Sequence, residues 1–108
     1  MMAHRLAAAT SDLIAAVAPV AGGIVLPTIN STRAIPVMHI HSVDDPRALY
    51  IGGLGPPFPL TKSQVFHPNI DDVIAKWVRH NGCALEPTII ERHSDRDGRG
   101  HQATKYVN

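Results

Sequence analysis

Residues 36–53 read PVMHIHSVDDPRALYIGG, and this stretch decides how the chain is expected to fold. Its apolar first half predicts a buried strand, in which His39 and His41 face the same side because side chains alternate along a strand. Two adjacent carboxylates, Asp44 and Asp45, follow in a polar turn. Catalytic groups in an α/β sheet are usually presented at the carboxyl ends of strands, so this turn is a candidate site.

Outward from this stretch, helical and extended patterns alternate along the chain. Helices are expected over residues 2–9 and 68–80, and strands over residues 14–21, 35–41, 87–92 and 103–107. Residues 44–68 are too rich in proline and glycine to be regular throughout. This alternation predicts the α/β class, with a mostly parallel sheet and flanking helices. The two central strands are apolar along their whole length, as expected for strands covered on both faces.

The second helix carries the clearest pattern. Acidic residues stand at its start and basic residues near its end, as the helix dipole favours. Apolar residues at helical spacing predict its buried face: Ile70, Val73, Ile74, Trp77 and Val78. In the first helix, Met2, Leu6 and Ala9 are expected to share one face.

Length and composition point to one small domain. The chain has 108 residues and a formal net charge of +1, so nothing in the charge balance predicts nucleic acid or an anionic membrane as a partner. The apolar run over residues 13–25 is too short and too broken to span a bilayer, and it is not a convincing signal peptide. Cys83 is the single cysteine and cannot form a disulfide within the chain. No cofactor is indicated.

Side chains around the same strand also allow a second interpretation. His39 and His41, followed by Asp44 and Asp45, have the ligand types of a metal site. This cluster predicts a non-catalytic α/β module that binds a metal or a partner. The sequence contains neither an HExxH nor a CxxC motif that would strengthen the metal hypothesis.

Several short motifs occur in order along the chain. They are MMAHRLA at residues 1–7, AAVAPVAG at 15–22, PVMHIHSVDD at 36–45, YIGG at 50–53, Trp77, and NGC at 81–83. Together they resemble the polyhydroxybutyrate depolymerase and feruloyl-esterase-like branch of the α/β-hydrolases. The resemblance covers nearly the whole chain, and it implies that residues 1–108 form a partial α/β-hydrolase domain, the C-terminal part of its sheet.

The resemblance also implies where a Ser-His-Asp triad would lie. In that family a Gly-x-Ser-x-Gly-Gly elbow directly precedes a helix that begins like residues 1–6, so the serine would stand a few residues before Met1. The family's acid lies in a His-Gly-Thr-x-Asp-like turn, which corresponds to residues 41–45 and makes Asp45 the triad acid. Ser42 replaces the usual glycine, which leaves a one-residue ambiguity with Asp44.

The triad histidine of the family belongs to a Gly-His-x-Trp-Pro-like motif. The nearest match, His101 in GHQA, lacks the Trp-Pro part and comes too early. The serines of the chain do not stand in an elbow motif: Ser11, Ser31, Ser42, Ser63 and Ser94. In the family the cysteine after Asn-Gly pairs with a later cysteine, which implies that a partner for Cys83 lies outside this chain.

The resemblance implies an activity for the parent enzyme. It would be a secreted serine carboxylic-ester hydrolase that acts through an acyl-enzyme. The partner would be an ester, and polyester, feruloylated polysaccharide and small esters all remain open. Since only Asp45 of the triad is assigned here, the isolated chain is expected to be inactive. The non-catalytic module and a chain that does not fold stably are the alternatives.

Overall fold

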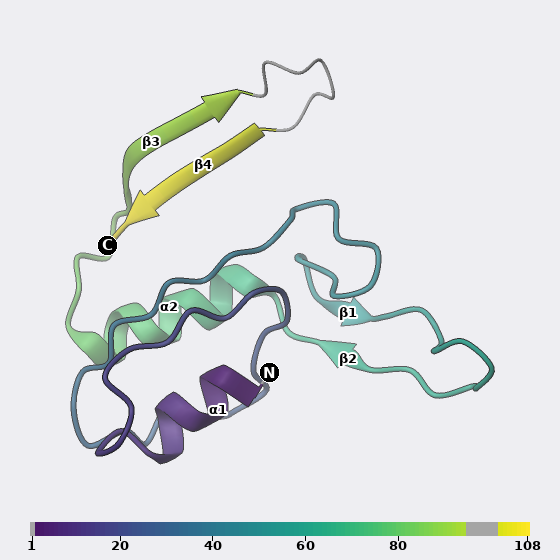
Figure 1. Cartoon of the computed structure of the whole chain (residues 1–108), viewed down its shortest axis with the longest axis horizontal. Coiled ribbons are helices and arrows are strands. Elements are labelled where there is room, and N and C mark those ends of the chain that lie inside the picture. The colour runs from purple at the N-terminus through teal and green to yellow at the C-terminus, as the bar shows by residue number, and fades with distance from the viewer. Residues whose placement is uncertain (1, 95–101) are drawn as a thin grey trace.

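The computed structural model describes residues 2–94 and 102–108. Within them it has two helices and two separate two-stranded antiparallel sheets (Figure 1). In chain order these elements are α1 (Met2–Ala9), β1 (Gly53–Leu54), β2 (Phe66–His67), α2 (Ile70–Asn81), β3 (Thr88–Ser94) and β4 (Gln102–Val107). None of the described helices is long and apolar enough to cross a bilayer.

The predicted parallel α/β sheet, and with it the partial α/β-hydrolase fold, is wrong. The two segments expected as central strands, residues 14–21 and 35–41, do lie side by side and run parallel. They are joined only by isolated bridges, at Val17–Val37 and Val20–Ile40, and the described strands pair only as two antiparallel hairpins.

Proline is the physical reason that this parallel pair does not continue as a ladder. The carbonyls of Pro36 and Pro19 accept hydrogen bonds from Val17 N at 3.0 Å and from Ile40 N at 2.9 Å. Neither proline has an N–H to donate in return, so each one interrupts the ladder. Ala21 then turns the chain away with a φ of 48°.

Helix α2 follows its sequence pattern closely, although it begins two residues later than predicted. The Asn69 side chain caps it by accepting hydrogen bonds from Asp71 N at 2.8 Å and Asp72 N at 3.4 Å. Gly82 ends it in a left-handed conformation with a φ of 67°. The predicted apolar face is confirmed, with four of its five side chains buried: Ile70, Val73, Trp77 and Val78.

Helix α1 is present over the predicted residues but buries a different face. Met2 and Leu6 are exposed, whereas His4, Ala7 and Ala8 are buried. The small alanines allow close packing, and His4 finds hydrogen-bonding partners inside the protein. Met2, Leu6 and Ala9, which were expected to share one face, are all exposed.

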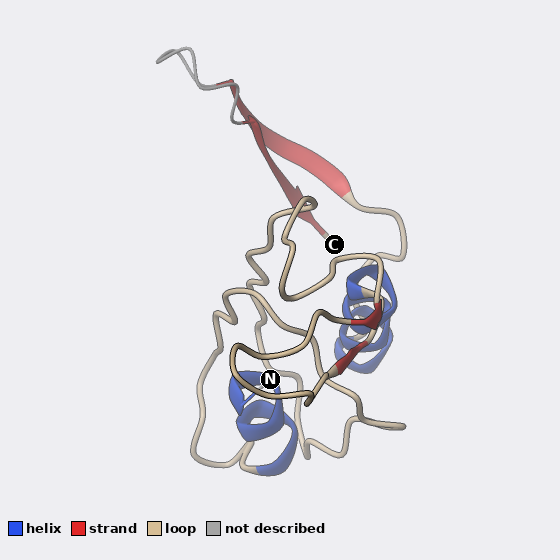
Figure 2. Cartoon of the chain, turned by 90° about the vertical axis from the view of Figure 1, so that its right-hand side faces the viewer, coloured by secondary structure: helices blue, strands red, loops and turns tan. Residues whose placement is uncertain are grey.

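The core lies between the two helices. It consists of Ala7, Ala8, Ile24, Ile35, Val73 and Trp77. Figure 2 shows α1 and α2 on either side of loop segments. Residues on either side of His41 contact the helices: His39 Nδ1 lies 3.2 Å from His4 Nε2 of α1, and Ile70 N of α2 donates to the Tyr50 carbonyl at 2.9 Å. These contacts position the candidate site.

Two hairpins project from this body (Figure 1). Strands β3 and β4 pair from Thr88 opposite Val107 to Ser94 opposite Gln102, which confirms the two strands predicted near the C-terminus. In the other hairpin, Leu54 pairs with Phe66. This second hairpin, residues 53–67, was expected to be irregular, and we call it the arm.

Candidate functional site

The turn after residue 41 holds the Asp45 carboxylate in a defined direction. Asp45 Oδ1 accepts hydrogen bonds from the backbone N–H groups of Ala48 and Arg47, each at 2.8 Å. These two hydrogen bonds stabilise the charged form and hold the pKa of Asp45 below its ordinary 3.8. Oδ2 lies 3.9 Å from His41 Nε2, too far for a hydrogen bond. One oxygen is therefore anchored, while the described residues leave the other available.

Asp44 has no comparable support. Its side chain is exposed, and its backbone N–H makes only a long hydrogen bond, 3.4 Å, to Ser42 Oγ. The turn itself closes through Asp45 N, which donates to the Ser42 carbonyl at 3.2 Å. Of the two adjacent carboxylates, Asp45 is the one whose orientation the turn determines.

Three histidines form a continuous hydrogen-bonded chain behind this turn. Trp77 Nε1 donates to His4 Nδ1 at 3.1 Å, His4 Nε2 lies 3.2 Å from His39 Nδ1, and His39 Nε2 lies 3.0 Å from His41 Nδ1. His41 Nε2 lies 2.6 Å from the Ala48 carbonyl. We call His4, His39 and His41 the histidine relay. It connects α2 in the core to the backbone of the Asp45 turn.

Both ends of the relay have a fixed polarity. The indole N–H of Trp77 can only donate, and the carbonyl of Ala48 can only accept. All four hydrogen bonds are satisfied together only when each histidine is neutral and carries its proton on Nε2. A proton added to His4 or His39 would place two donors against each other.

The environment of the relay favours the neutral state as well. Burial, and to a lesser extent the neighbouring His39, lowers the pKa of His4 from 6.5 to about 4. Burial and the neighbouring His41 lower the pKa of His39 from 6.5 to about 4. The rings of the relay are stacked, with centroids 5.2 Å apart for His4 and His39 and 5.3 Å apart for His39 and His41.

The predicted pairing of His39 with His41 on one side of the chain is confirmed by their hydrogen bond. The same contact occupies the atoms that a metal would need, because both ring nitrogens of His39 are engaged with other histidines. Within residues 2–94 and 102–108, no group of three or more histidine, cysteine, aspartate or glutamate side chains is placed to hold a metal ion.

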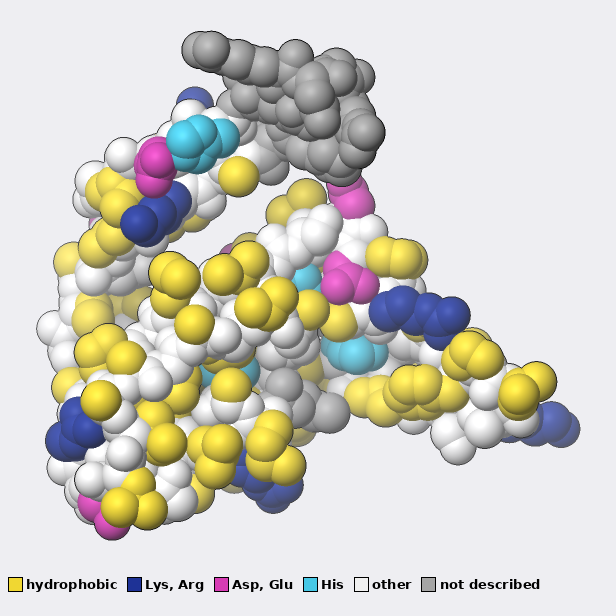
Figure 3. Space-filling view, viewed as in Figure 1, with side chains coloured by type: hydrophobic (Ala, Val, Ile, Leu, Met, Phe, Trp, Pro, Cys, Tyr) yellow, Lys and Arg dark blue, Asp and Glu magenta, His cyan; other side chains and the backbone are white. Residues whose placement is uncertain are grey.

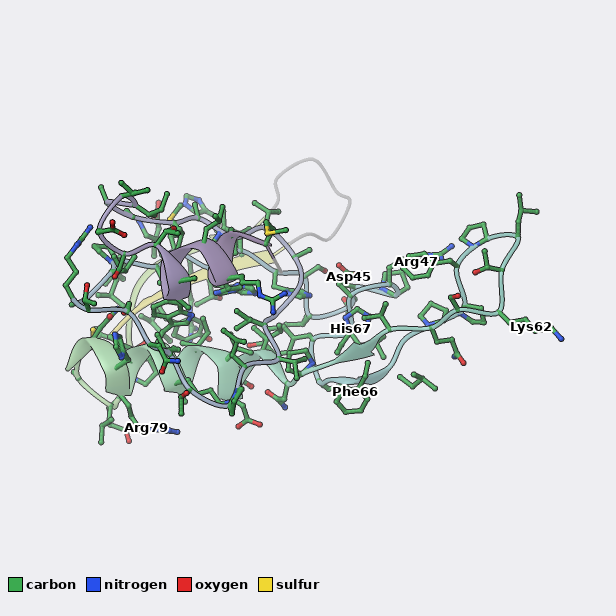
Figure 4. All side chains as sticks on the ribbon, turned by 90° about the horizontal axis from the view of Figure 1, so that it is seen from below. Asp45, Arg47, Lys62, Phe66, His67 and Arg79 are labelled. Carbon is green, nitrogen blue, oxygen red and sulfur yellow. The ribbon has the colours of Figure 1, made fainter. Side chains whose placement is uncertain are left out.

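His67 is a residue near the site that sequence reasoning missed. It lies in β2 at the base of the arm, close to Asp45 (Figure 4), and its electrostatic interaction with the carboxylate is the smallest of the causes that lower the Asp45 pKa. Gly55 makes room for its ring, since a Cβ at that position would lie 2.7 Å from His67 Nε2. Only the pairing of β1 with β2 brings these residues together, so no local signal pointed to His67.

The described serines include one that is bonded to a histidine. Ser31 Oγ is hydrogen-bonded to His80 Nε2 and also donates to the Arg33 carbonyl at 2.9 Å. His80 is in the last turn of α2 and Ser31 is in a loop beside it, whereas the segment that follows the Asp45 turn contacts the first turn of α2, where Ile70 N donates to the Tyr50 carbonyl at 2.9 Å. Asp45 therefore does not orient His80.

The remaining candidate residues take no part in the Asp45 turn. Ser11 Oγ is buried and bonded to Thr32 Oγ1 at 3.0 Å. Cys83 is a half-buried free thiol. His101 lies outside the described residues. An open depression of about 460 Å³ runs along α2 and includes His67, Lys76 and Arg79 in its lining, but Asp45 does not line it.

The chain was compared with models of protein families, with curated proteins and with solved structures, and none of them matches it.

Proposed function

We propose that this chain carries the acid residue of a serine carboxylic-ester hydrolase, and that Asp45 is that residue. The resemblance of its ordered motifs to the polyhydroxybutyrate depolymerase and feruloyl-esterase-like enzymes suggests the chemistry. The serine and the histidine of the triad lie outside residues 2–94 and 102–108 in this proposal.

The geometry of the Asp45 carboxylate is the observation that carries the proposal. A triad acid must remain ionised and must offer one oxygen to the Nδ1–H of the catalytic histidine. Asp45 meets both requirements, because two backbone N–H groups hold Oδ1 and lower the pKa, and Oδ2 is left for another donor. The exposed side chain of Asp44 has no such backbone anchor among the described residues, so the turn does not fix its direction.

His41 does not take the role of the triad base, despite its position near Asp45. Its Nε2–H donates to the Ala48 carbonyl and its Nδ1 accepts from His39. Neither nitrogen is free to remove a proton from a serine. The role of the relay in this proposal is to support the turn that presents Asp45.

In the complete reaction, serine would attack the ester carbonyl while the histidine takes its proton. The histidine would then return that proton to the departing alcohol, and water would hydrolyse the acyl-enzyme by the same route. Asp45 would hold the histidine in the correct tautomer and stabilise its charged form. Without the serine, these 108 residues alone should not hydrolyse an ester.

Reading the coding DNA on both sides of this chain is the first test. We expect an in-frame Gly-x-Ser-x-Gly-Gly ending at Met1 and a Gly-His-x-Trp-Pro-like motif downstream of residue 108. Intact flanking sequence without these motifs would contradict the proposal. So would hydrolysis of a p-nitrophenyl ester by the purified 108-residue protein that disappears in Asp45→Ala.

The second test uses the extended polypeptide and a matched pair of variants. In Asp45→Asn we expect kcat to fall by about 10⁴, the loss typical of a triad that loses its acid. In Asp44→Asn we expect a change of less than about threefold, because the exposed Asp44 carboxylate orients nothing. A larger loss in Asp44→Asn than in Asp45→Asn would assign the acid to Asp44.

A further inference from the structure

The arm displays large hydrophobic side chains to solvent. Those exposed on it are Leu54, Phe58, Leu60 and Phe66. Figure 3 shows the arm as the lobe at the right, covered mainly by hydrophobic side chains with basic side chains among them. Contiguous apolar surface of this kind usually marks an interaction site.

The tip of the arm is unusual for an exposed turn. Leu60 is fully exposed, with a relative accessibility of 105%, and has a φ of 64°. Glycine or asparagine normally takes a left-handed position, because other side chains are strained there. A leucine here combines backbone strain with the exposure of apolar surface to water. Neither is explained by the packing of the arm itself.

The arm is also held in one shape. Phe58 N donates to the Ser63 carbonyl at 3.0 Å, Thr61 N donates to the Phe58 carbonyl at 3.1 Å, and Gln64 Nε2 donates to the Gly55 carbonyl at 2.8 Å. Three prolines restrict the backbone between β1 and the tip: Pro56, Pro57 and Pro59. A preformed arm loses little conformational freedom when it binds a surface.

The charged side chains that extend along the arm away from its base have one sign. Residues 46–70 contain no aspartate or glutamate, but they include Arg47 and Lys62, and both are exposed. Lys62 stands near the tip, and Arg47 runs along the arm, where its guanidinium donates to the Pro57 carbonyl at 3.4 Å (Figure 4). Carboxylates border the arm at its base, where Asp45 lies close to His67 and Asp72 lines a depression together with Phe66. The net charge of the whole chain, which is +1, does not reveal this local separation of charge.

We propose that the arm docks onto the surface of an anionic phospholipid bilayer, with Leu60 entering between the headgroups. Apolar side chains beside cations suit this interface, because the apolar groups leave water while the cations meet the lipid phosphates. A second copy of the chain is a poorer occupant, since it would bring Arg47 and Lys62 of two arms together. The inference does not rest on the proposed esterase chemistry.

Vesicle binding of the whole chain tests this proposal. We expect the protein to sediment with vesicles of phosphatidylcholine and phosphatidylglycerol at low salt, and binding to weaken as salt screens the charges. Vesicles of phosphatidylcholine alone should bind it at least about tenfold more weakly, because each cation near an anionic surface contributes several-fold. Equal binding to both vesicles, or binding to neither, would overturn the proposal.

Two pairs of variants locate the contact. Leu60→Asn removes the apolar side chain and suits the left-handed backbone, so it should weaken binding about tenfold without unfolding the protein. Leu13→Asn changes a leucine that is 78% exposed on the body and should leave binding unchanged. Lys62→Glu should weaken binding about tenfold or more, whereas Lys105→Glu, an equal change of charge on β4, should not.

The fluorescence of the single, buried Trp77 reports whether each variant is folded. Weaker binding of Leu13→Asn or Lys105→Glu to the same degree as the arm variants would overturn the assignment to the arm. Sedimentation of the protein without vesicles, lost in Leu60→Asn, would overturn the bilayer in favour of self-association through the arm.

Discussion

Acid should destabilise this protein through the histidine relay. His4 and His39 fit their hydrogen bonds only when neutral, and the pKa of each is lowered from 6.5 to about 4. The unfolded chain therefore binds more protons than the folded protein at pH values between these limits. By linkage, the free energy of unfolding falls as the pH falls from about 6.5 towards 4, and it is fully recovered above 6.5.

The size of the effect follows from the same pKa values. At pH 5 a histidine in the unfolded chain is almost fully protonated, whereas His4 and His39 stay neutral, a difference of about 2 kcal/mol for each residue taken alone. The two residues share one relay and solvent reaches His39, so we expect about 3 kcal/mol for the pair between pH 7.5 and pH 5. Asp45 adds nothing in this window because its pKa lies below 3.8.

Urea unfolding measured at the two pH values checks this prediction. Trp77 is the only tryptophan, is 2% exposed and donates to His4, so its fluorescence reports both the core and the relay. The midpoint should move to lower urea at pH 5, and the slope of the free energy against urea should stay the same.

Two variants separate the relay from other histidines. Gln at position 39 can still accept from His4 and donate to His41 but does not titrate, so His39→Gln should lose about half of the pH dependence. His93→Gln changes a histidine on β3 that is 70% exposed, and this variant should keep the full pH dependence of the free energy of unfolding. A free energy of unfolding that is equal at both pH values, or higher at pH 5, would refute the reasoning.

Three further predictions concern local features of the fold. Asn69→Ala should lower the free energy of unfolding by about 1 kcal/mol because α2 loses its cap, whereas Asn69→Asp should keep it; equal loss in both variants would argue against the cap. Gly52→Ala should cost about 2 kcal/mol or more, since its φ is 82° and a Cβ would lie 2.7 Å from Asn69 N. Gly82 has a φ of 67° and open space around it, so Gly82→Ala should lower the free energy of unfolding by only about 1 kcal/mol in the same urea assay. A larger loss in Gly82→Ala than in Gly52→Ala would contradict this account. Burial and the hydrogen bond to Asp71 raise the pKa of Tyr50 to about 12, so Tyr50 should ionise late in a phenolate absorbance titration. Above pH 10 the unfolded tyrosine releases its proton first, and stability should fall as the pH rises; Tyr50→Phe should remove the late step, and its persistence would show that another group is responsible.

The elements with short-range signals were predictable from the sequence. Helix α2 has its acidic start, apolar stripe and terminal glycine within a dozen residues, and β3 and β4 are joined by a short polar segment. The buried position of Trp77 followed from the same stripe. These features depend on contacts between close neighbours in the chain, so propensity and periodicity were sufficient to locate them.

The Asp45 turn was partly predictable. Its place after an apolar segment and its Asp-Pro sequence indicated a bend with an aimed carboxylate. The anchoring of Oδ1 by two backbone N–H groups agrees with such a bend. The assignment of Asp45 as a triad acid stays a prediction, because it rests on the resemblance and on an unassigned histidine.

Sequence patterns by themselves determined the two helices, the C-terminal hairpin and the bend at Asp45, since each depends on local interactions. Only the tertiary structure decided that residues 14–21 and 35–41 pair through two isolated bridges and not through a continuous ladder, because Pro19 and Pro36 have no N–H to continue it. It also decided that His4 is hydrogen-bonded to His39, and that His67 lies near Asp45. Such contacts join residues far apart in the chain, and a ring nitrogen finds its partner only when packing brings the two together.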